Sequence, residues 1–102
     1  MTIQLLPTAE SEIADGMDYY NEVQSGLGYE FALEVKKGLL RISSFPNAWP
    51  IFQDSIRITH LKRFPYAILY EVQTNVLVVF AVMHLKQNPK TWEKHLETYL
   101  KR

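Results

Sequence analysis

The strongest constraint on the fold is an uninterrupted apolar run in the second half of the chain, Val76 to Met83. Successive side chains of a β-strand point to opposite faces of a sheet, so a run that is apolar at every position needs cover on both faces. At 8 residues the run is far shorter than the roughly 20 that cross a bilayer. It therefore predicts a strand, Val76–His84, in the interior of a sheet.

Two more strands are predicted just before this run. Ile56–His60 alternates strictly between apolar and polar residues, so one face is apolar and the other presents Arg57. Tyr66–Gln73 is rich in aromatic and aliphatic residues. The Thr74-Asn75 pair predicts a tight turn, because asparagine tolerates positive φ. These strands should form an antiparallel meander.

The first half predicts a short strand, Ile3–Leu5, and then two helices. Each helix shows apolar residues at spacings of three or four: Ala9, Ile13, Met17, Tyr20 and Val23 in the first, and Phe31, Val35, Leu39 and Ile42 in the second. The Ser25–Gly28 segment ends the first helix, because glycine accepts the left-handed conformation of a helix C-cap. Helices joined by so short a link form an antiparallel hairpin.

Pro89 is well placed at the start of a terminal helix over Thr91–Lys101, and Asn47–Gln53 is expected to be a loop. The hairpin can bury its apolar stripe only against the sheet. The expected fold is therefore a single α+β domain over residues 1–102. It has two layers, with the helical hairpin on an antiparallel sheet in the order β-α-α-β-β-β and a short C-terminal helix. The first strand is expected to run antiparallel to the last.

The composition of the chain indicates in which cellular compartment it folds and which kinds of binding site it can form. The chain has no cysteine, which excludes disulfides and thiolate metal sites and favours a reducing cytoplasm. Its N-terminus lacks the basic and apolar regions of a signal peptide, and no metal or cofactor signature is present. The formal net charge is zero, yet residues 1–50 carry −4 and residues 51–102 carry +4. This polarity predicts one acidic and one basic surface.

Four side chains in the basic half are the candidate site. Arg57 and Arg63 can bind phosphate or carboxylate in a fork geometry. His84 can act as a general acid or base near neutral pH, and Lys86 shares its strand parity. In metal-free RNA cleavage, this set would move the protons and stabilise the phosphorane. All four are expected to converge on one wall of the sheet.

The chain resembles the RelE/ParE superfamily, the toxins of bacterial type II toxin–antitoxin modules, often called plasmid stabilisation proteins. The resemblance covers roughly residues 5–92. It rests on Ala9-Glu10, Tyr19-Tyr20, Leu27-Gly28, Phe31, Pro46, Arg57, Arg63-Phe64-Pro65-Tyr66, Tyr70, Val82-Met83-His84-Leu85-Lys86, Pro89 and Trp92.

The resemblance implies a helical hairpin on a twisted sheet and a cognate antitoxin that wraps the toxin. It also implies growth inhibition by one of two activities. RelE-like members cleave mRNA on the ribosome, whereas ParE-like members inhibit DNA gyrase. A homodimer and a toxin–antitoxin hetero-oligomer are both compatible with it.

Two departures from the family pattern separate these activities. Relatives commonly carry one or two arginines after the histidine, where this chain has Lys86 and Gln87. Lysine loses the bidentate fork, and glutamine loses the charge. Ribosomal RNA binding also draws on positive charge, which a neutral chain lacks. A protein target such as gyrase is therefore favoured. A ribosome-dependent endoribonuclease and a non-toxic binding domain stay open as alternatives.

Overall fold

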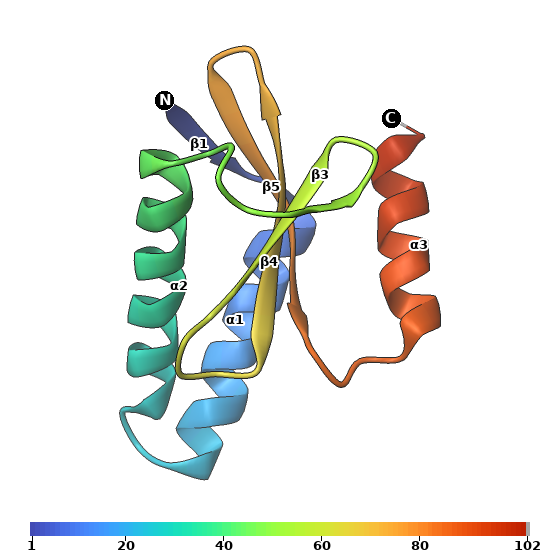
Figure 1. Cartoon of the computed structure of the whole chain (residues 1–102). Helices are drawn as coiled ribbons and strands as arrows, with labels where there is room; N and C mark the ends of the chain where they lie inside the picture. Colours follow the sequence, from blue (N-terminus) through green and yellow to red (C-terminus); the bar gives the residue numbers. More distant parts are fainter. Residues whose placement is uncertain (102) are drawn as a thin grey trace.

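A computed structural model describes residues 1–101 as one sheet flanked by three helices (Figure 1). The elements are β1 (Thr2–Leu5), α1 (Pro7–Val23), α2 (Leu27–Ser44), β2 (Ile51–Gln53), β3 (Ile56–His60), β4 (Tyr66–Gln73), β5 (Val76–His84) and α3 (Pro89–Leu100). No helix within the described part of the chain combines the length and the apolar character needed to cross a membrane.

The antiparallel hairpin of α1 and α2 depends on two close approaches at glycine. Gly16 of α1 lies against the ring of Phe31 on α2, and the Gly28 N–H donates to Asn21 Oδ1 at 2.9 Å. Gly26, in the link, has φ 88°, a left-handed conformation that glycine adopts without strain. These contacts confirm the predicted hairpin.

The sheet has the strand order β1-β5-β4-β3-β2. β4 pairs antiparallel with β5 from Gln73↔Val76 at the turn to Tyr66↔His84 at the far end. β3 pairs antiparallel with β4, so that Arg57 lies beside Tyr70. The meander is therefore confirmed, with the predicted bounds for β4 and β5.

The predicted antiparallel pairing of the first and last strands is wrong. β1 pairs with β5 in parallel, with Thr2 opposite Val76, so the sheet is mixed. The reason is a missed strand: residues 51–53, expected to be loop, form β2 antiparallel to β3. Its hairpin adds one reversal of direction, which inverts every later strand relative to β1.

The two faces of the sheet carry separate cores. On the hairpin face, the sheet packs against α1 and α2. The core between them consists chiefly of Phe31, Val35 and Ile42 of α2 and of Ile68, Tyr70, Leu77, Val79 and Val82 of the sheet. The opposite face buries Ile56, Leu69, Phe80 and Met83 under Leu96 and Tyr99 of α3. The predicted hairpin-on-sheet arrangement is confirmed, and α3 adds a partial third layer (Figure 1). β5 is buried on both faces, as its composition predicts.

Candidate functional site

Arg57 is held by the backbone of the loop before β2. Its Nη1 atom donates to the carbonyl oxygen of Trp49 at 2.6 Å, and the side chain is only partly buried. It lies beside Tyr70, whose hydroxyl donates to the Pro46 carbonyl at 2.8 Å. Burial raises the pKa of Tyr70 to about 12, while the positive charge of Arg57 acts in the opposite direction. Arg57 thus fastens the Trp49 segment to the hairpin face of the sheet.

Arg63 is occupied by an ion pair with the hairpin. Its Nη2 atom lies 2.6 Å from Glu30 Oε1, and its guanidinium stacks over the Phe64 ring at 5.6 Å from the centroid. The hydrogen bond that Arg63 donates to the Glu30 carboxylate raises the pKa of Arg63. This contact ties the loop between β3 and β4 to the first turn of α2.

His84 ends β5 and opens a tight turn. The Lys86 N–H donates to His84 Nδ1 at 3.0 Å, and the Gln87 side chain accepts from the His84 N–H at 3.2 Å. A neutral imidazole that accepts at Nδ1 carries its proton on Nε2. The ring packs edge-on against Tyr66, with centroids 5.0 Å apart. Gln87, a departure from the family pattern, therefore stabilises the turn that positions His84.

A hollow of about 390 Å³ surrounds the imidazole, between α1 and the end of β5. We call it the His84 hollow. Its lining consists of Glu12, Asp15, Gly16, Tyr19, Tyr66, Val82, His84 and Gln87. The described lining includes two carboxylates and no lysine or arginine. A phosphodiester would meet negative charge beside His84, because the acidic helix α1 forms the opposite wall.

The four predicted side chains do not converge. His84 and Lys86 are neighbours in one turn. Arg57 shares the hairpin face with His84, but the two pair with different residues of β4. Arg57 lies beside Tyr70 and His84 beside Tyr66, four residues away, which is about 13 Å at about 3.3 Å per residue. Arg63 is directed to Glu30 on α2. The predicted single cationic wall is therefore not formed around His84.

A partly buried carboxylate that the sequence reasoning missed connects three elements. Glu12 of α1 accepts the Val82 N–H at 2.9 Å and lies 3.2 Å from His95 Nε2 on α3. His95 Nδ1 in turn lies 2.9 Å from the Thr91 carbonyl oxygen. Burial raises the pKa of Glu12, against the lowering effects of the Val82 N–H and His95. Because β1 ends at Leu5, Glu12 supplies the acceptor that a longer strand would have offered. One signal was available: Glu12 lies three residues from the buried Ala9 on the helical pattern.

Glu12→Gln should change the pH dependence of stability. The raised pKa means that folding favours the protonated carboxyl. That contribution is fully present below the ordinary pKa of 4.5 and is lost as the pH rises through the folded value. A glutamine keeps the Val82 acceptor and cannot ionise. We therefore expect the unfolding free energy of the variant, relative to the parent, to increase between about pH 4 and about pH 7, measured by urea denaturation.

Glu12→Ala is the contrasting variant. It removes the acceptor and leaves the Val82 N–H without its partner, which should cost about 1–3 kcal/mol near neutral pH. If the stability of Glu12→Gln relative to the parent fell with rising pH, the pKa of Glu12 would be lowered by folding and not raised.

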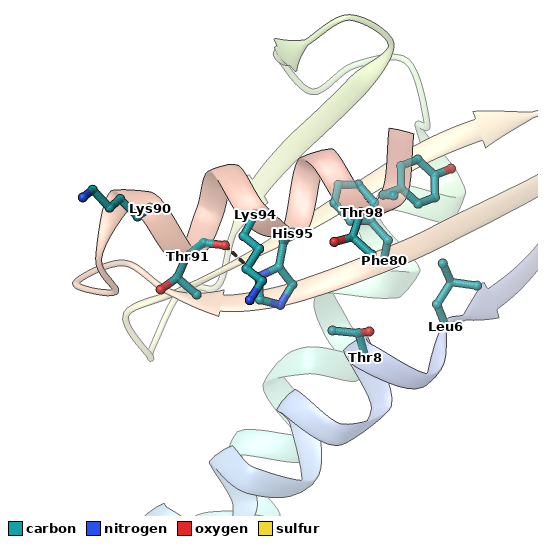
Figure 2. A pocket seen from close by; sticks show the side chains of 9 residues that line it. Leu6, Thr8, Phe80, Lys90, Thr91, Lys94, His95 and Thr98 are labelled. Carbon is teal, nitrogen blue, oxygen red and sulfur yellow. Dashed lines mark hydrogen bonds between the residues drawn. The ribbon is translucent and has the colours of Figure 1, made fainter. Parts of the chain in front are cut away.

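A second and larger cavity, of about 590 Å³, lies between α3 and the start of α1 (Figure 2). We call it the α3 groove. Its lining consists of Leu6, Thr8, Phe80, Lys90, Thr91, Lys94, His95, Thr98 and Tyr99. The sequence reasoning did not single out any of these residues. The two lysines are spaced one helical turn apart, which is the signal that could have drawn attention to them.

Comparison with known proteins rests on structure alone. No protein-family model matches the chain, and no curated protein sequence matches it. Among solved structures, it is similar to a chain of the chromosomal ParDE TA system from P. aeruginosa. The TM-score is 0.76 at 12% sequence identity, over 84% of this chain and 97% of that chain. The chain therefore has the fold found in this ParDE structure, which confirms the RelE/ParE-like fold expected from the sequence.

Proposed function

We propose that the chain is the ParE-like toxin of a bacterial type II toxin–antitoxin module and inhibits growth through a protein target such as DNA gyrase. The shared fold with a ParDE structure supports the toxin assignment. The family resemblance in residues 5–92 supports it independently. The module would act in the cytoplasm and pair with a cognate antitoxin.

The choice of a protein target over mRNA rests on the acidic lining of the His84 hollow. An endoribonuclease needs cations beside the scissile phosphate to stabilise the charge of the transition state. Here Glu12 and Asp15 line the same hollow as the imidazole, while Arg57 binds a backbone carbonyl and Arg63 binds Glu30. Only Lys86 remains next to His84, on an exposed turn. These contacts favour a protein target over ribosome-bound mRNA.

Induced expression of the chain should arrest growth, and the purified protein should inhibit supercoiling by gyrase. His84→Ala should retain both effects within about twofold, because the imidazole does no proton transfer in this mechanism. The matched control is His60→Ala, since His60 is an exposed histidine at the end of β3. Gyrase that supercoils normally at micromolar protein would contradict the gyrase assignment.

The alternatives give different results in the same cells. A RelE-like enzyme using Arg57, Arg63, His84 and Lys86 would leave codon-linked cuts in translated mRNA, seen by primer extension and abolished by His84→Ala. A binding domain that keeps only the fold would be harmless when expressed without an antitoxin. A short neighbouring reading frame with a DNA-binding N-terminus and a flexible tail would support the module itself.

A further inference from the structure

The α3 groove is open because α3 rests on only part of the sheet. Leu96 and Tyr99 pack on the sheet, and the Tyr99 ring stacks on Phe80 at a centroid distance of 4.3 Å. β1 is only four residues long, so the space between α3 and the start of α1 is not covered by the sheet. Figure 2 shows Lys94 and His95 directed from α3 toward the side where Leu6 and Thr8 lie.

The chemistry of the groove is that of an apolar floor with a cationic rim. Leu6 and the small accessible part of Phe80, which is 3% exposed beside Tyr99, supply apolar surface, and Lys90 and Lys94 supply positive charge. None of the nine described lining residues is acidic, and neither ammonium group forms an ion pair within residues 1–101. Both lysines are exposed. A ligand with an apolar side chain next to carboxylates would complement both features.

The position of the groove favours a peptide as the occupant. β1 is an edge strand, paired with β5 and with no second partner strand in the described part of the chain. An incoming segment can add to such an edge through main-chain hydrogen bonds. Leu6, the residue directly after β1, lines the groove. A segment added along β1 would therefore arrive at the groove and place a side chain on Phe80.

We propose that the α3 groove binds a segment of the antitoxin in which apolar side chains alternate with carboxylates. This inference rests on the proposed toxin function and assigns its partner to a definite surface. The apolar side chain fills the space over Phe80, and the carboxylates pair with Lys90 and Lys94.

The test is a titration of the isotopically labelled full chain with a short synthetic peptide of alternating leucine and glutamate, followed by NMR. We expect the amide signals of Leu6, Thr8 and Lys94 to shift, with an affinity that falls as salt is added. Lys90→Glu/Lys94→Glu should weaken binding by about tenfold or more, because like charges would then face each other. Lys36→Glu/Lys62→Glu, the same charge change at exposed sites elsewhere, should alter it less than about twofold.

Three results would overturn the assignment. One is a peptide affinity unchanged by Lys90→Glu/Lys94→Glu in a variant whose spectrum shows it folded. Another is a shift of the groove signals with decanoate but not with the peptide, which would mark a fatty-acyl site. The third is a shift with protein concentration alone, which would mean that a second copy fills the groove.

The readout is independent of toxicity. A chain that binds the peptide through these lysines but leaves growth unaffected keeps the binding site and removes the toxin proposal. A toxic chain that binds the peptide equally well without the lysines removes only the groove assignment.

Discussion

Phe31→Ala is expected to lower the free energy of unfolding by about 3–5 kcal/mol, the usual cost of truncating a fully buried phenylalanine. Phe31 has no exposed surface. Its ring centroid lies 5.4 Å from that of Tyr20, 5.3 Å from Phe64 and 4.8 Å from Tyr66. The truncation removes one ring from this cluster and leaves a cavity where the hairpin meets the sheet. Denaturant unfolding of the purified variant measures the loss.

The effect should extend to the His84 hollow. Tyr66 contacts Phe31 on one side and the His84 ring on the other, so a relaxed Tyr66 should shift the imidazole signals in an NMR spectrum. Leu40→Ala is the control on the same helix, because Leu40 is 56% exposed and should change stability by no more than about 0.5 kcal/mol. A loss below about 1 kcal/mol for Phe31→Ala would mean that the cluster does not hold the hairpin on the sheet.

Gly28→Ala should cost about 2–3 kcal/mol by overpacking the hairpin. A Cβ atom at this position would lie 2.3 Å from the Met17 carbonyl oxygen and 2.6 Å from Asn21 Cγ. The Met17 oxygen is backbone and cannot rotate away, so α1 and α2 would have to separate. Thermal or urea unfolding gives the magnitude, and helix content by circular dichroism shows whether the hairpin survives.

Gly26 provides the comparison, because a substitution there strains the backbone conformation without creating a steric clash. An added Cβ there meets nothing within 4 Å, but φ is 88°. Gly26→Ala should therefore cost only about 1–2 kcal/mol, and Gly26→Asn less, since asparagine tolerates the left-handed region. Asparagine at position 28 should be no better than alanine. Equal tolerance of asparagine at the two positions would contradict the steric account of Gly28.

The centre of the sheet could be predicted because its signals are local. A run that is apolar at every position identified β5 as a strand covered on both faces. The Thr74-Asn75 pair marked the β4–β5 turn, although Thr74, at φ 47°, and not Asn75 adopts the positive φ. The helical hairpin followed from periodicity and from the glycine link. In each case a short segment of the sequence is sufficient to predict the element.

The direction of β1 and the positions of the cations depended on long-range geometry. The prolines at positions 46 and 50 favoured a loop over Asn47–Gln53, yet the β2–β3 hairpin decides how every later strand runs relative to β1. The carbonyl that binds Arg57 and the carboxylate that binds Arg63 come from other segments of the chain. Residue type marked these arginines as available for a ligand, whereas tertiary contacts occupy them.

The parallel pairing of β1 with β5 also bears on synthesis. During synthesis, Thr2–Leu5 have no strand partner until Val76–Val79 have been made. The α1–α2 hairpin can form much earlier from local contacts, because closing a long loop costs more entropy than closing a short one. The edge of β5 that β1 occupies is therefore closed last. A nascent chain therefore completes its sheet only after Val79 has been made, by which time both helices of the hairpin are already present.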